Sequence, residues 1–597
     1  MRYDNNPIRR LLTPALAGLL ALGLAACGNT GDEDPSVGDP DPQPTPESGQ
    51  TSFYSAAGQN GQQSEQNNDS SYGADSGSRN KEAGAAGAPS NNRQIEEGDI
   101  YRVIDHSKQI LNLNRYRGLQ VIDFSDPKNP DVIGRARISG RPVEMYLVGD
   151  KVYALLNNWR AYYSAGNQKS LMPDAYSGGV VAVIDISDPK NPKVTKRAQV
   201  PGNIETSRLT RGGGKEALFV VASGRNRTSG GGTIQPTRST SGSTTYVRSF
   251  DVNGRGKLAA KSKLDLGGNV ADIQGVENHL LVARDVRDKN HNHTGSKVSV
   301  IDISNPSGKM REGSQVKVKG RVQNKHNMDL HNGILRVVSG ATWNGAQENH
   351  IETFDASNIE NLTKIDHTSF AKGERLEATL FMGEKAFFVT YEQIDPLFAF
   401  HIDKKGKLEQ KSEFEITGWN DYFVPVEDGK RLIGIGMNDE EGFTMAVSLY
   451  DSTDLSNKKP FIAREEVPMD YSRSEANRDD RAFSVLENAT KVKAKDGTVE
   501  TGLVLLPFQG WDRKNHEYKS GVQIFTFSDK TLTRRGTMDH GTPVRRSFMA
   551  ERDKDLTGNL SEAELSLFDT SKPDKPSEVG RVELAPNYND YWKFGKY

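Results

Sequence analysis

Oxygen-bearing side chains alternate along residues 553–564, where the sequence reads Asp-Lys-Asp-Leu-Thr-Gly-Asn-Leu-Ser-Glu-Ala-Glu. Carboxylates stand at the first and third positions (Asp553 and Asp555), a hydroxyl at the fifth (Thr557) and another carboxylate at the twelfth (Glu564). Ca²⁺ is a hard cation that binds through several such oxygens, and a glutamate can supply two of them. The spacing predicts a calcium-binding loop.

This segment resembles the calcium loop of an EF-hand. The resemblance implies these ligands: Asp553, Asp555, Thr557, the Asn559 carbonyl and Glu564. Gly558 would permit the tight turn. The segment departs from the EF-hand pattern at Leu556, and residues 565–568 read as a strand where a flanking helix should stand. The alternative is a polar hairpin that turns at residues 557–559.

The histidines form two groupings, His291 with His293 and His326 with His331. Neither grouping has a third ligand at the local spacing that metal sites use. Because Asn and Lys surround the first pair, we expect a solvated loop there and no metal site.

Acidic and basic residues alternate closely between Glu475 and Arg481, with Asp479 and Asp480 beside Arg478. Such a run favours a salt-linked rim over a general acid-base pair, which needs positioned groups with shifted pKa values. The sequence also contains no Gly-x-Ser-x-Gly elbow, Walker loop or His-Glu-x-x-His stretch. We therefore predict no catalytic residue from the sequence.

Cys27 is the single cysteine, and it follows Leu24-Ala-Ala at the end of a short apolar run preceded by arginines. The run is short for a membrane span and is typical of a cleaved secretory signal. Leu24–Cys27 resembles a bacterial lipobox, which implies that residues 1–26 are removed and that Cys27 carries acyl chains such as palmitate. The resemblance to lipoprotein sorting signals further implies that, in a bacterium with two membranes, Gly28 after the cysteine favours the outer one. The alternative is an ordinary signal peptide whose cysteine is incidental. An acylated Cys27 leaves no thiol for catalysis, metal binding or a disulfide.

Residues 27–95 are rich in Gly, Ser, Asn, Gln and Pro, and few of them are aliphatic. This composition predicts a disordered tether between the lipid and the folded part. The formal net charge is −2, with 77 basic and 79 acidic residues. No global basic field supports binding to nucleic acid.

From residue 96 to the end, the chain consists of short runs of β-branched and aromatic residues between turn residues, which predicts strands. Residues 118–130 and 180–192 share the pattern apolar strand, Asp, Ser-Asp-Pro-Lys-Asn-Pro. We interpret their aspartates as turn residues that accept backbone N–H bonds. Metal binding by these side chains is the alternative. The aspartates are Asp123, Asp126, Asp185 and Asp188.

A strand, a Gly-centred hairpin and a second strand precede each of these elements, most clearly in residues 143–155. Together the two elements make a unit of four strands that recurs along residues 96–590. A recurring four-strand unit predicts a β-propeller, because each blade buries both faces against its neighbours. We expect an all-β ring of about eight blades, within seven to nine.

Residues 373–398 resemble the signature blade of bacterial secreted and lipoprotein β-propeller domains, which are distantly related to WD repeats. Residues 421–436, 327–336 and 481–483 resemble the flanking blades, and the Val-Ile-Asp units resemble the family's Leu-Val-Ile-Val-Asp repeats. The pattern departs at Leu376-Glu377, at Phe400-His401 and in the 228–245 insertion. The resemblance implies a propeller at the cell surface and no established reaction.

Two functions remain open. The first is a lipid-anchored, non-enzymatic scaffold in the cell envelope that binds a protein, peptide or glycan; the second is a propeller enzyme, a hydrolase or oxidoreductase, with a site on the central channel. Four or more converging Asp, Glu, His or Arg side chains at the channel mouth would favour the enzyme. We favour the scaffold, with calcium as the one cofactor that the sequence suggests.

Overall fold

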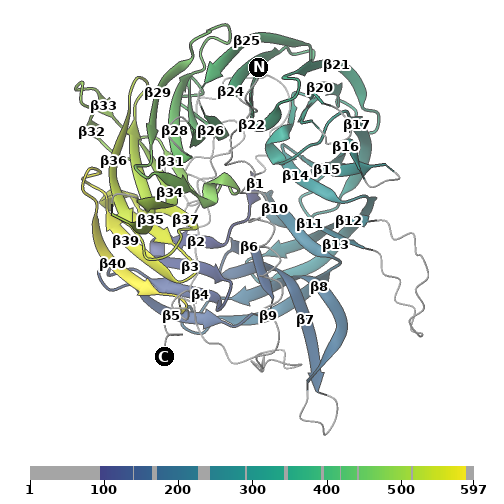
Figure 1. The fold of residues 1–597 in the computed structure, drawn as a ribbon. Helices are drawn as coiled ribbons and strands as arrows, with labels where there is room; N and C mark the ends of the chain where they lie inside the picture. Colours follow the sequence, from purple (N-terminus) through teal and green to yellow (C-terminus); the bar gives the residue numbers. More distant parts are fainter. Residues whose placement is uncertain are drawn as a thin grey trace.

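Nine antiparallel sheets stand around a central axis in the part of the chain that the computed structural model describes (Figure 1). The described residues are 94–138, 140–164, 171–225, 243–288, 292–341, 347–391, 395–416, 418–439, 443–512 and 515–586. The predicted all-β propeller is confirmed, with nine blades at the upper limit of the expected range. Its described helices are single 3₁₀ turns, and none is long and apolar enough to cross a membrane.

Each blade is one contiguous stretch of chain, and its strands run in sequence order from the axis outward. Blades 1 to 3 comprise β2 (Tyr101–Ile104), β3 (Gln109–Asn114), β4 (Gly118–Asp123) and β5 (Asp131–Ala136); β6 (Arg141–Val148), β7 (Lys151–Ser164), β8 (Leu171–Asp185) and β9 (Lys193–Val200); and β10 (Asn203–Gly212), β11 (Lys215–Arg225), β12 (Ser243–Asn253) and β13 (Lys257–Gly267). Blades 4 to 6 comprise β14 (Val270–Val276), β15 (His279–Arg287), β16 (His293–Asp302) and β17 (Arg311–Val318); β18 (Met328–His331), β19 (Ile334–Ser339), β20 (Asn349–Asp355) and β21 (Thr363–Phe370); and β22 (Arg375–Met382), β23 (Lys385–Tyr391), β24 (Asp395–Ile402) and β25 (Leu408–Ile416).

Blades 7 to 9 comprise β26 (Trp419–Val426), β27 (Arg431–Asn438), β28 (Thr444–Asp451) and β29 (Phe461–Glu466); β30 (Tyr471–Arg473), β31 (Ser484–Leu486), β34 (Gly502–Asp512), β35 (Glu517–Phe527) and β36 (Leu532–Asp539); and β37 (Arg546–Glu551), β38 (Leu556–Leu560), β39 (Glu564–Asp569) and β40 (Ser577–Glu583). A small hairpin, β32 (Val492–Lys493) with β33 (Val499–Glu500), interrupts blade 8. The 3₁₀ turns are η3 (Asp105–Ser107), η4 (Lys325–Asn327), η5 (Glu475–Asn477) and η6 (Arg552–Lys554).

An apolar core fills each of the nine interfaces between neighbouring blades in the described part. Strand β8 shows why its sequence is continuously apolar. Val181 and Val183 pack toward blade 3, whereas Val180 and Ile184, on the opposite face, pack toward blade 1. Successive residues of a strand point to opposite faces, so a strand buried on both sides needs apolar residues at every position.

The aspartates that end the outer strands form the predicted turns. The Asp123 carboxylate accepts hydrogen bonds from the Ser125 N–H at 2.8 Å and from the Ser125 hydroxyl at 2.6 Å. Asp185 accepts from the Ser187 N–H at 2.9 Å in the same way. The Asp126 carboxylate accepts from the Lys128 N–H, two residues further along the chain. Local N–H groups thus occupy these carboxylates, as the turn interpretation requires.

Blades 1 and 9 close the ring, as Figure 1 shows where the yellow C-terminal blade meets the purple N-terminal one. The Tyr101 and Phe548 rings lie 4.4 Å apart between their centroids in the shared core. The Gln120 side-chain amide donates to the Leu584 carbonyl at 2.8 Å. Within the described residues no strand is exchanged between the two blades, so side-chain packing and side-chain hydrogen bonds close the ring.

The first described strand, β1 (Gln94–Glu97), belongs to the middle of the ring. It pairs antiparallel with β10, inside the inner edge of blade 3, and the chain then passes blade 2 to enter blade 1. Gly98 makes this passage possible, because a Cβ there would lie 2.9 Å from the side chains of Glu144 and Tyr146. The last two residues of the predicted tether, 94 and 95, therefore lie in a strand.

Two blades replace part of their inner strand with a 3₁₀ turn. In blade 5, η4 precedes the short strand β18; in blade 8, η5 and residues 478–483 separate β30 from β31. Both turns have a capping box, with Asn324 and Ser474 as the N-caps. These irregular segments carry charged side chains to the ring axis.

Candidate functional site

Charged side chains from several blades converge on the ring axis around β1. We call this group the axial cluster. Its members are Glu97, Asp99, Glu144, Arg208, Lys325, Asp479, Asp480, Arg481 and Arg546. They come from the N-terminal segment and from blades 2, 3, 5, 8 and 9.

The N-terminal segment supplies the central carboxylates of the axial cluster. Glu97 binds the Lys325 ammonium at 2.7 Å and lies 3.5 Å from the Arg208 guanidinium. Asp99, which is almost fully buried, receives two hydrogen bonds from Arg546, at 2.7 and 2.9 Å. The N-terminal segment therefore neutralises bases from three different blades.

The irregular segment of blade 8 completes the axial cluster. Asp479 binds Arg481 at 2.9 Å and Arg546 at 2.6 Å, and Asp480 binds Lys325 at 2.8 Å. Burial alone would raise the pKa of Asp480, but Lys325 and His326 hold that pKa well below its usual value. Asp479, Asp480 and Arg481 are salt-linked, as predicted, but they lie at the axis and not on a rim. Glu475 and Arg478, in contrast, are exposed.

Glu144 is the member of the axial cluster whose charge is least stabilised. It is 2% exposed on β6, its carboxylate lies 3.5 Å from Arg481, and it accepts a hydrogen bond from the Ser207 hydroxyl. Burial raises the pKa of Glu144 to about 7, because these partners do not replace the water it has lost.

Asp421 lies at the inner edge of blade 7, next to the axial cluster, and is partly exposed. It accepts hydrogen bonds from the Trp419 indole at 3.1 Å and from the Asn477 side chain at 2.8 Å. Burial, with a smaller contribution from the nearby Glu377 carboxylate, raises the pKa of Asp421 to about 7. A carboxyl group of this kind is able to exchange a proton near neutral pH.

The axial cluster meets the numerical condition that would favour an enzyme, since more than four Asp, Glu and Arg side chains converge at the axis. Each member, however, has an oppositely charged partner within 3.5 Å. These groups are therefore paired with one another, and β1 and the segment after it supply two of the carboxylates, Glu97 and Asp99. The cluster joins blades that are distant in the sequence.

The structure does not bring the predicted calcium ligands together. Asp553 lies in η6 and Asp555 follows it in a left-handed conformation, whereas residues 556–560 form β38. Glu564 lies beyond the other end of this strand and binds Arg581 at 2.6 Å. A five-residue strand separates the two ends by roughly 17 Å.

Thr557 and Asn559 are fully buried within β38. The Asn559 side chain binds the Ser547 hydroxyl at 2.8 Å, and the Thr557 hydroxyl lies 3.2 Å from the Met538 sulfur. The EF-hand-like loop is therefore corrected to a strand, since the apolar residues Leu556 and Leu560 pack into the interface between blades 9 and 1. No group of three or more metal-ligating side chains occurs among the described residues.

The remaining predicted residues lie apart from one another. Cys27 and His291 lie outside the described residues. His293 lies 3.5 Å from Asp285 in blade 4, and His326 lies 3.3 Å from Asp480 at the axis.

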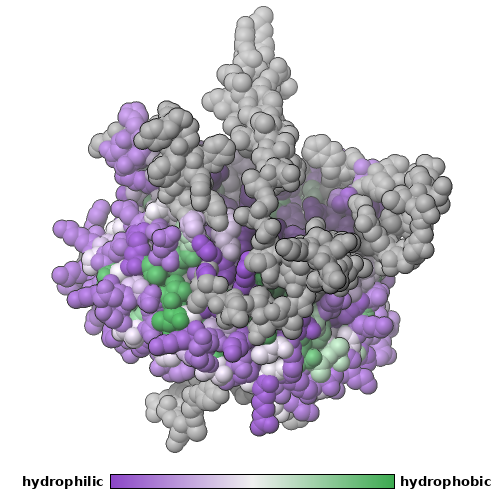
Figure 2. Space-filling view, turned by 90° about the horizontal axis from the view of Figure 1, so that it is seen from below, coloured by the Kyte–Doolittle hydropathy of each residue, from purple (hydrophilic) through white to green (hydrophobic). Residues whose placement is uncertain are grey.

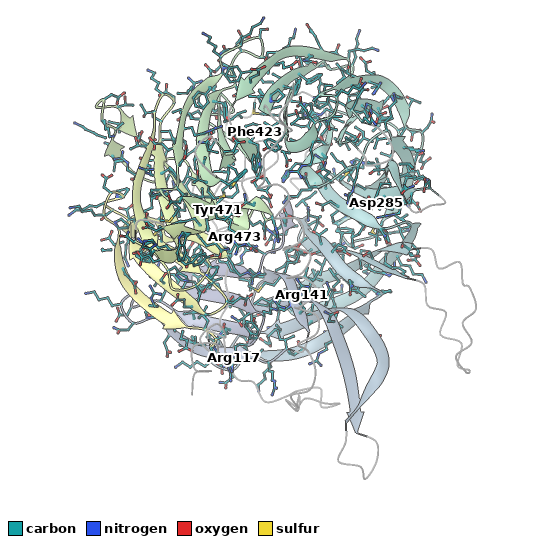
Figure 3. All side chains as sticks on the ribbon, in the orientation of Figure 1. Arg117, Arg141, Asp285, Phe423, Tyr471 and Arg473 are labelled. Carbon is teal, nitrogen blue, oxygen red and sulfur yellow. The ribbon has the colours of Figure 1, made fainter. Side chains whose placement is uncertain are left out.

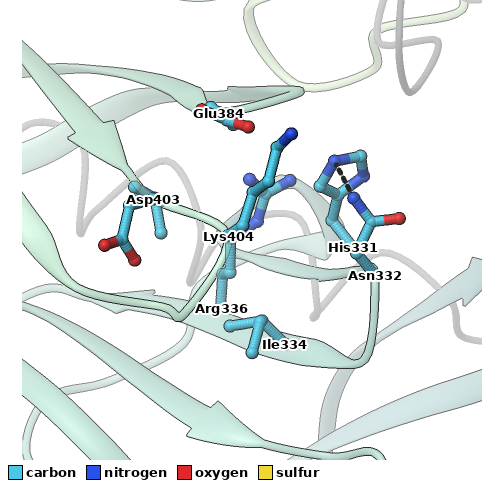
Figure 4. A pocket seen from close by; sticks show the side chains of 8 residues that line it. His331, Asn332, Ile334, Arg336, Glu384, Asp403 and Lys404 are labelled. Atoms are coloured by element: carbon cyan, nitrogen blue, oxygen red, sulfur yellow. Dashed lines mark hydrogen bonds between the residues drawn. The ribbon is translucent and has the colours of Figure 1, made fainter. Parts of the chain in front are cut away.

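His331 lines a small hollow between blades 5 and 6, shown in Figure 4. Its imidazole lies 3.1 Å from the Asn332 amide, and the central Arg336 binds Asp329 at 2.7 Å in the core. The Arg336 guanidinium of this hollow is thus already engaged.

Sequence reasoning missed most of the axial cluster, although its members leave a signal. Arg208 and Arg546 are charges in inner strands, whereas Glu97 ends β1 and Asp99 lies between β1 and β2. A charge at a buried strand position needs a partner. The sequence alone does not identify that partner.

Comparison with known proteins agrees with the fold. A family model described as a beta propeller domain matches residues 90–229 and 224–558. An uncharacterized protein of Methanocaldococcus jannaschii is 35% identical over 147 residues, which is 24% of this chain and 22% of that protein. An uncharacterized protein of Archaeoglobus fulgidus is 32% identical over 142 residues, 24% of this chain and 21% of that protein. The matches thus span about a fifth of each relative.

Among solved structures, the chain is similar to a putative 6-phosphogluconolactonase from Bacteroides uniformis, with a TM-score of 0.33 and 12% identity over 62% of this chain and 97% of that one. It is also similar to an apocarotenoid oxygenase from Synechocystis, with a TM-score of 0.31 and 10% identity over 63% of this chain and 89% of that one. Similarity at these scores carries no argument about function.

Proposed function

We propose that this chain, which belongs to the beta propeller domain family, is a non-enzymatic binding scaffold held in the cell envelope by a lipid on Cys27. The folded ring would present its loops and blade edges to a protein, peptide or glycan partner. Residues 28–93 would connect the ring to the lipid at the outer membrane.

The mutual pairing of the charges at the ring axis is the observation that carries this proposal. A propeller enzyme needs reactive groups that face a substrate, whereas the charges at this axis are paired with one another around β1. Lys325 and Arg546, which could attract an anionic substrate, are already bound to the chain's own Glu97 and Asp99. The outer surface of the propeller is then the part that can meet a partner. On the face shown in Figure 2 this surface is mostly hydrophilic, with small hydrophobic patches.

Membrane fractionation tests the anchor. The Cys27→Ala chain should move from the membrane fraction to the soluble envelope fraction or the medium, because it cannot be acylated. Cys27→Ala protein that still sediments with membranes would refute the lipid anchor.

Binding to envelope material tests the scaffold. The soluble, full-length Cys27→Ala chain should cosediment saturably with washed envelopes and be competed by unlabelled chain, whereas the same chain after heat unfolding should not compete. Absence of saturable binding would refute the scaffold.

Asp421 favours the enzyme as a second candidate, because a partly exposed carboxyl with a pKa near 7 suits proton transfer. Chromogenic ester, glycoside and phosphate substrates test it. Turnover that is lost in Asp421→Asn and kept in Glu360→Gln, an exposed glutamate distant from the axis, would establish the enzyme. If the folded chain turns over none of these substrates faster than the heat-unfolded chain does, the enzyme is rejected and the scaffold remains the proposal.

A further inference from the structure

Three aromatic side chains form an exposed row across blade 8. Tyr471 on β30 pairs with Trp511 on β34, and Trp511 pairs with Tyr518 on β35. Paired residues of neighbouring strands point to the same face of a sheet, so the three rings lie side by side. Their residues are 48%, 42% and 53% exposed. Two strand spacings make the row roughly 10 Å long.

The three rings lie on a face of the blade 8 sheet that is buried further along the same strands. Leu505 and Ile524, on this face, pack against Met549 and Phe568 of blade 9. Strands β34 and β35 each have 11 residues, whereas the inner strands of blade 9 have six and five. The β34–β35 hairpin therefore extends past blade 9. Its face carries the aromatic row where blade 9 no longer covers it.

The strand that carries Tyr471 is fixed in place. The Ser472 N–H donates to the Phe443 carbonyl at 2.9 Å, and the Ser472 hydroxyl accepts from the Met445 N–H at 2.7 Å, which holds β30 against blade 7. Gly510 allows the close approach of β30 to β34, because a Cβ there would lie 2.5 Å from the Tyr471 carbonyl oxygen. The rings thus stand on a preorganised platform, which lowers the entropic cost of binding.

The next set of paired positions on the same face is polar. It consists of Arg473, Gln509 and Ser520, and the Tyr518 hydroxyl donates to the Gln509 side-chain oxygen. Figure 3 shows Tyr471 and Arg473 close together on the inner side of the blade. These six positions include no carboxylate and no aliphatic side chain. The surface therefore offers flat rings beside amide, guanidinium and hydroxyl groups.

We propose that blade 8 binds a polysaccharide of uncharged pyranose sugars across Tyr471, Trp511 and Tyr518. Pyranose rings present apolar C–H faces to aromatic rings and hydroxyls to neighbouring hydrogen-bonding groups, which matches the two sets of positions. Without a carboxylate, these six positions offer no ion-pair partner for a cationic segment. The nearby Lys519 ammonium is bound to Asp512 and Glu517, at 3.1 and 2.7 Å, so Lys519 adds no uncompensated positive charge to that of Arg473. The site rests on the proposed scaffold role and gives it a partner class.

Affinity electrophoresis of the full-length Cys27→Ala chain in gels containing a soluble neutral β-glucan, a soluble mannan or a soluble xylan tests this site. At least one of these polysaccharides should retard the chain. Trp511→Ala should weaken that binding by about tenfold or more, since a central aromatic anchor dominates such a surface. Trp511→Phe, which keeps a flat ring, should restore most of it. Tyr116→Ala, at a 49% exposed tyrosine in blade 1, is the matched control and should bind like the parent.

Envelope cosedimentation separates failure of this site from failure of the scaffold. If no polysaccharide retards the chain, or if Trp511→Ala binds like Tyr116→Ala, the polysaccharide site is refuted while saturable envelope binding keeps the scaffold. If protease treatment of the envelopes abolishes a binding that depends on Trp511, the row binds a protein and the polysaccharide proposal is refuted. If envelope binding is itself absent, the scaffold is refuted whatever the gels show.

Discussion

Asp99 and Arg546 stand 447 positions apart in the chain, yet their side chains form a two-point ion pair at 2.7 and 2.9 Å near the ring axis. Asp99 precedes the first blade and Arg546 begins the last, so this pair joins the two ends of the propeller where the ring closes. Arg546 also binds Asp479 at 2.6 Å, which connects the junction to blade 8.

Removing the Arg546 charge should destabilise the whole domain. Arg546→Met leaves the Asp99 carboxylate buried without its partner, and breaking a buried pair in this way typically costs about 3–5 kcal/mol. Urea unfolding of the Cys27→Ala background should show a correspondingly lower midpoint. Arg311→Met, at an exposed ion pair with Asp302, is the control and should change the midpoint far less. Equal midpoints for the two variants would contradict a structural role for the axial pair.

Glu144 should make the protein less stable as the pH rises. Its pKa is raised from 4.5 to about 7 by burial, so the folded state must lose a proton that it holds more tightly than the unfolded state does. The favourable contribution is complete below pH 4.5 and is lost as the pH rises through about 7, by about 3 kcal/mol. Between these pH values the unfolding free energy of the parent should therefore fall relative to that of Glu144→Gln, which has no carboxyl to titrate at this position. A constant difference from pH 4.5 to 8 would contradict the shifted carboxyl.

His540 should act in the opposite direction. This histidine is buried in blade 9, its Nδ1 lies 2.7 Å from the Ser566 hydroxyl, and burial lowers its pKa from 6.5 to about 4. Its contribution to stability is present above pH 6.5 and is lost as the pH falls through about 4, because the unfolded state takes up the proton first. His540→Gln should lose less stability than the parent between pH 6.5 and 4. The exposed His106→Gln should follow the parent, and identical pH profiles for all three proteins would rule this role out.

Ring closure should depend on blade 9. Truncation after Gly541 removes β37 to β40 and exposes Tyr101, Val103 and Ile110 of blade 1, which pack against that blade. The open ring also leaves apolar surface on blade 8, so thermal unfolding should begin tens of degrees lower or lose cooperativity. Truncation after Pro586, which keeps all nine blades, should unfold like the parent. A cooperative transition of unchanged midpoint in the shorter chain would show that closure is dispensable.

Calcium should not stabilise the segment 553–564. Glu564 binds Arg581 at 2.6 Å and the Gly541 N–H at 2.7 Å, so its carboxylate is a structural acceptor within blade 9. Glu564→Gln should lower the unfolding free energy by about 1–3 kcal/mol, equally with and without roughly 10 mM calcium. A calcium-dependent rise in the parent's midpoint that this variant abolishes would restore the loop interpretation.

The repeated strand units were readable from the sequence because their causes are local. The turn at Asp123 needs only a carboxylate, the N–H and hydroxyl groups of Ser125 and a proline, all within a few residues. The segment after Asp553 was misread for a related reason. Alternating polar residues fit both a ligand loop and a strand, and only the partners of Thr557 and Asn559 in blades 8 and 9 distinguish the two.

The sequence by itself determined the propeller class and the strands that end in Asp turns, since hydrophobic period and turn chemistry act over a few residues. Only the tertiary structure decided that nine blades close the ring, that β1 enters the axis, and that Asp99 meets Arg546 there. These outcomes depend on the summed angles between blades and on charges hundreds of residues apart, which no local pattern records. Lys325 and Glu97 are unremarkable surface-type residues in the sequence. Folding removes them from water together, and the energetic cost of burying either charge alone makes them partners.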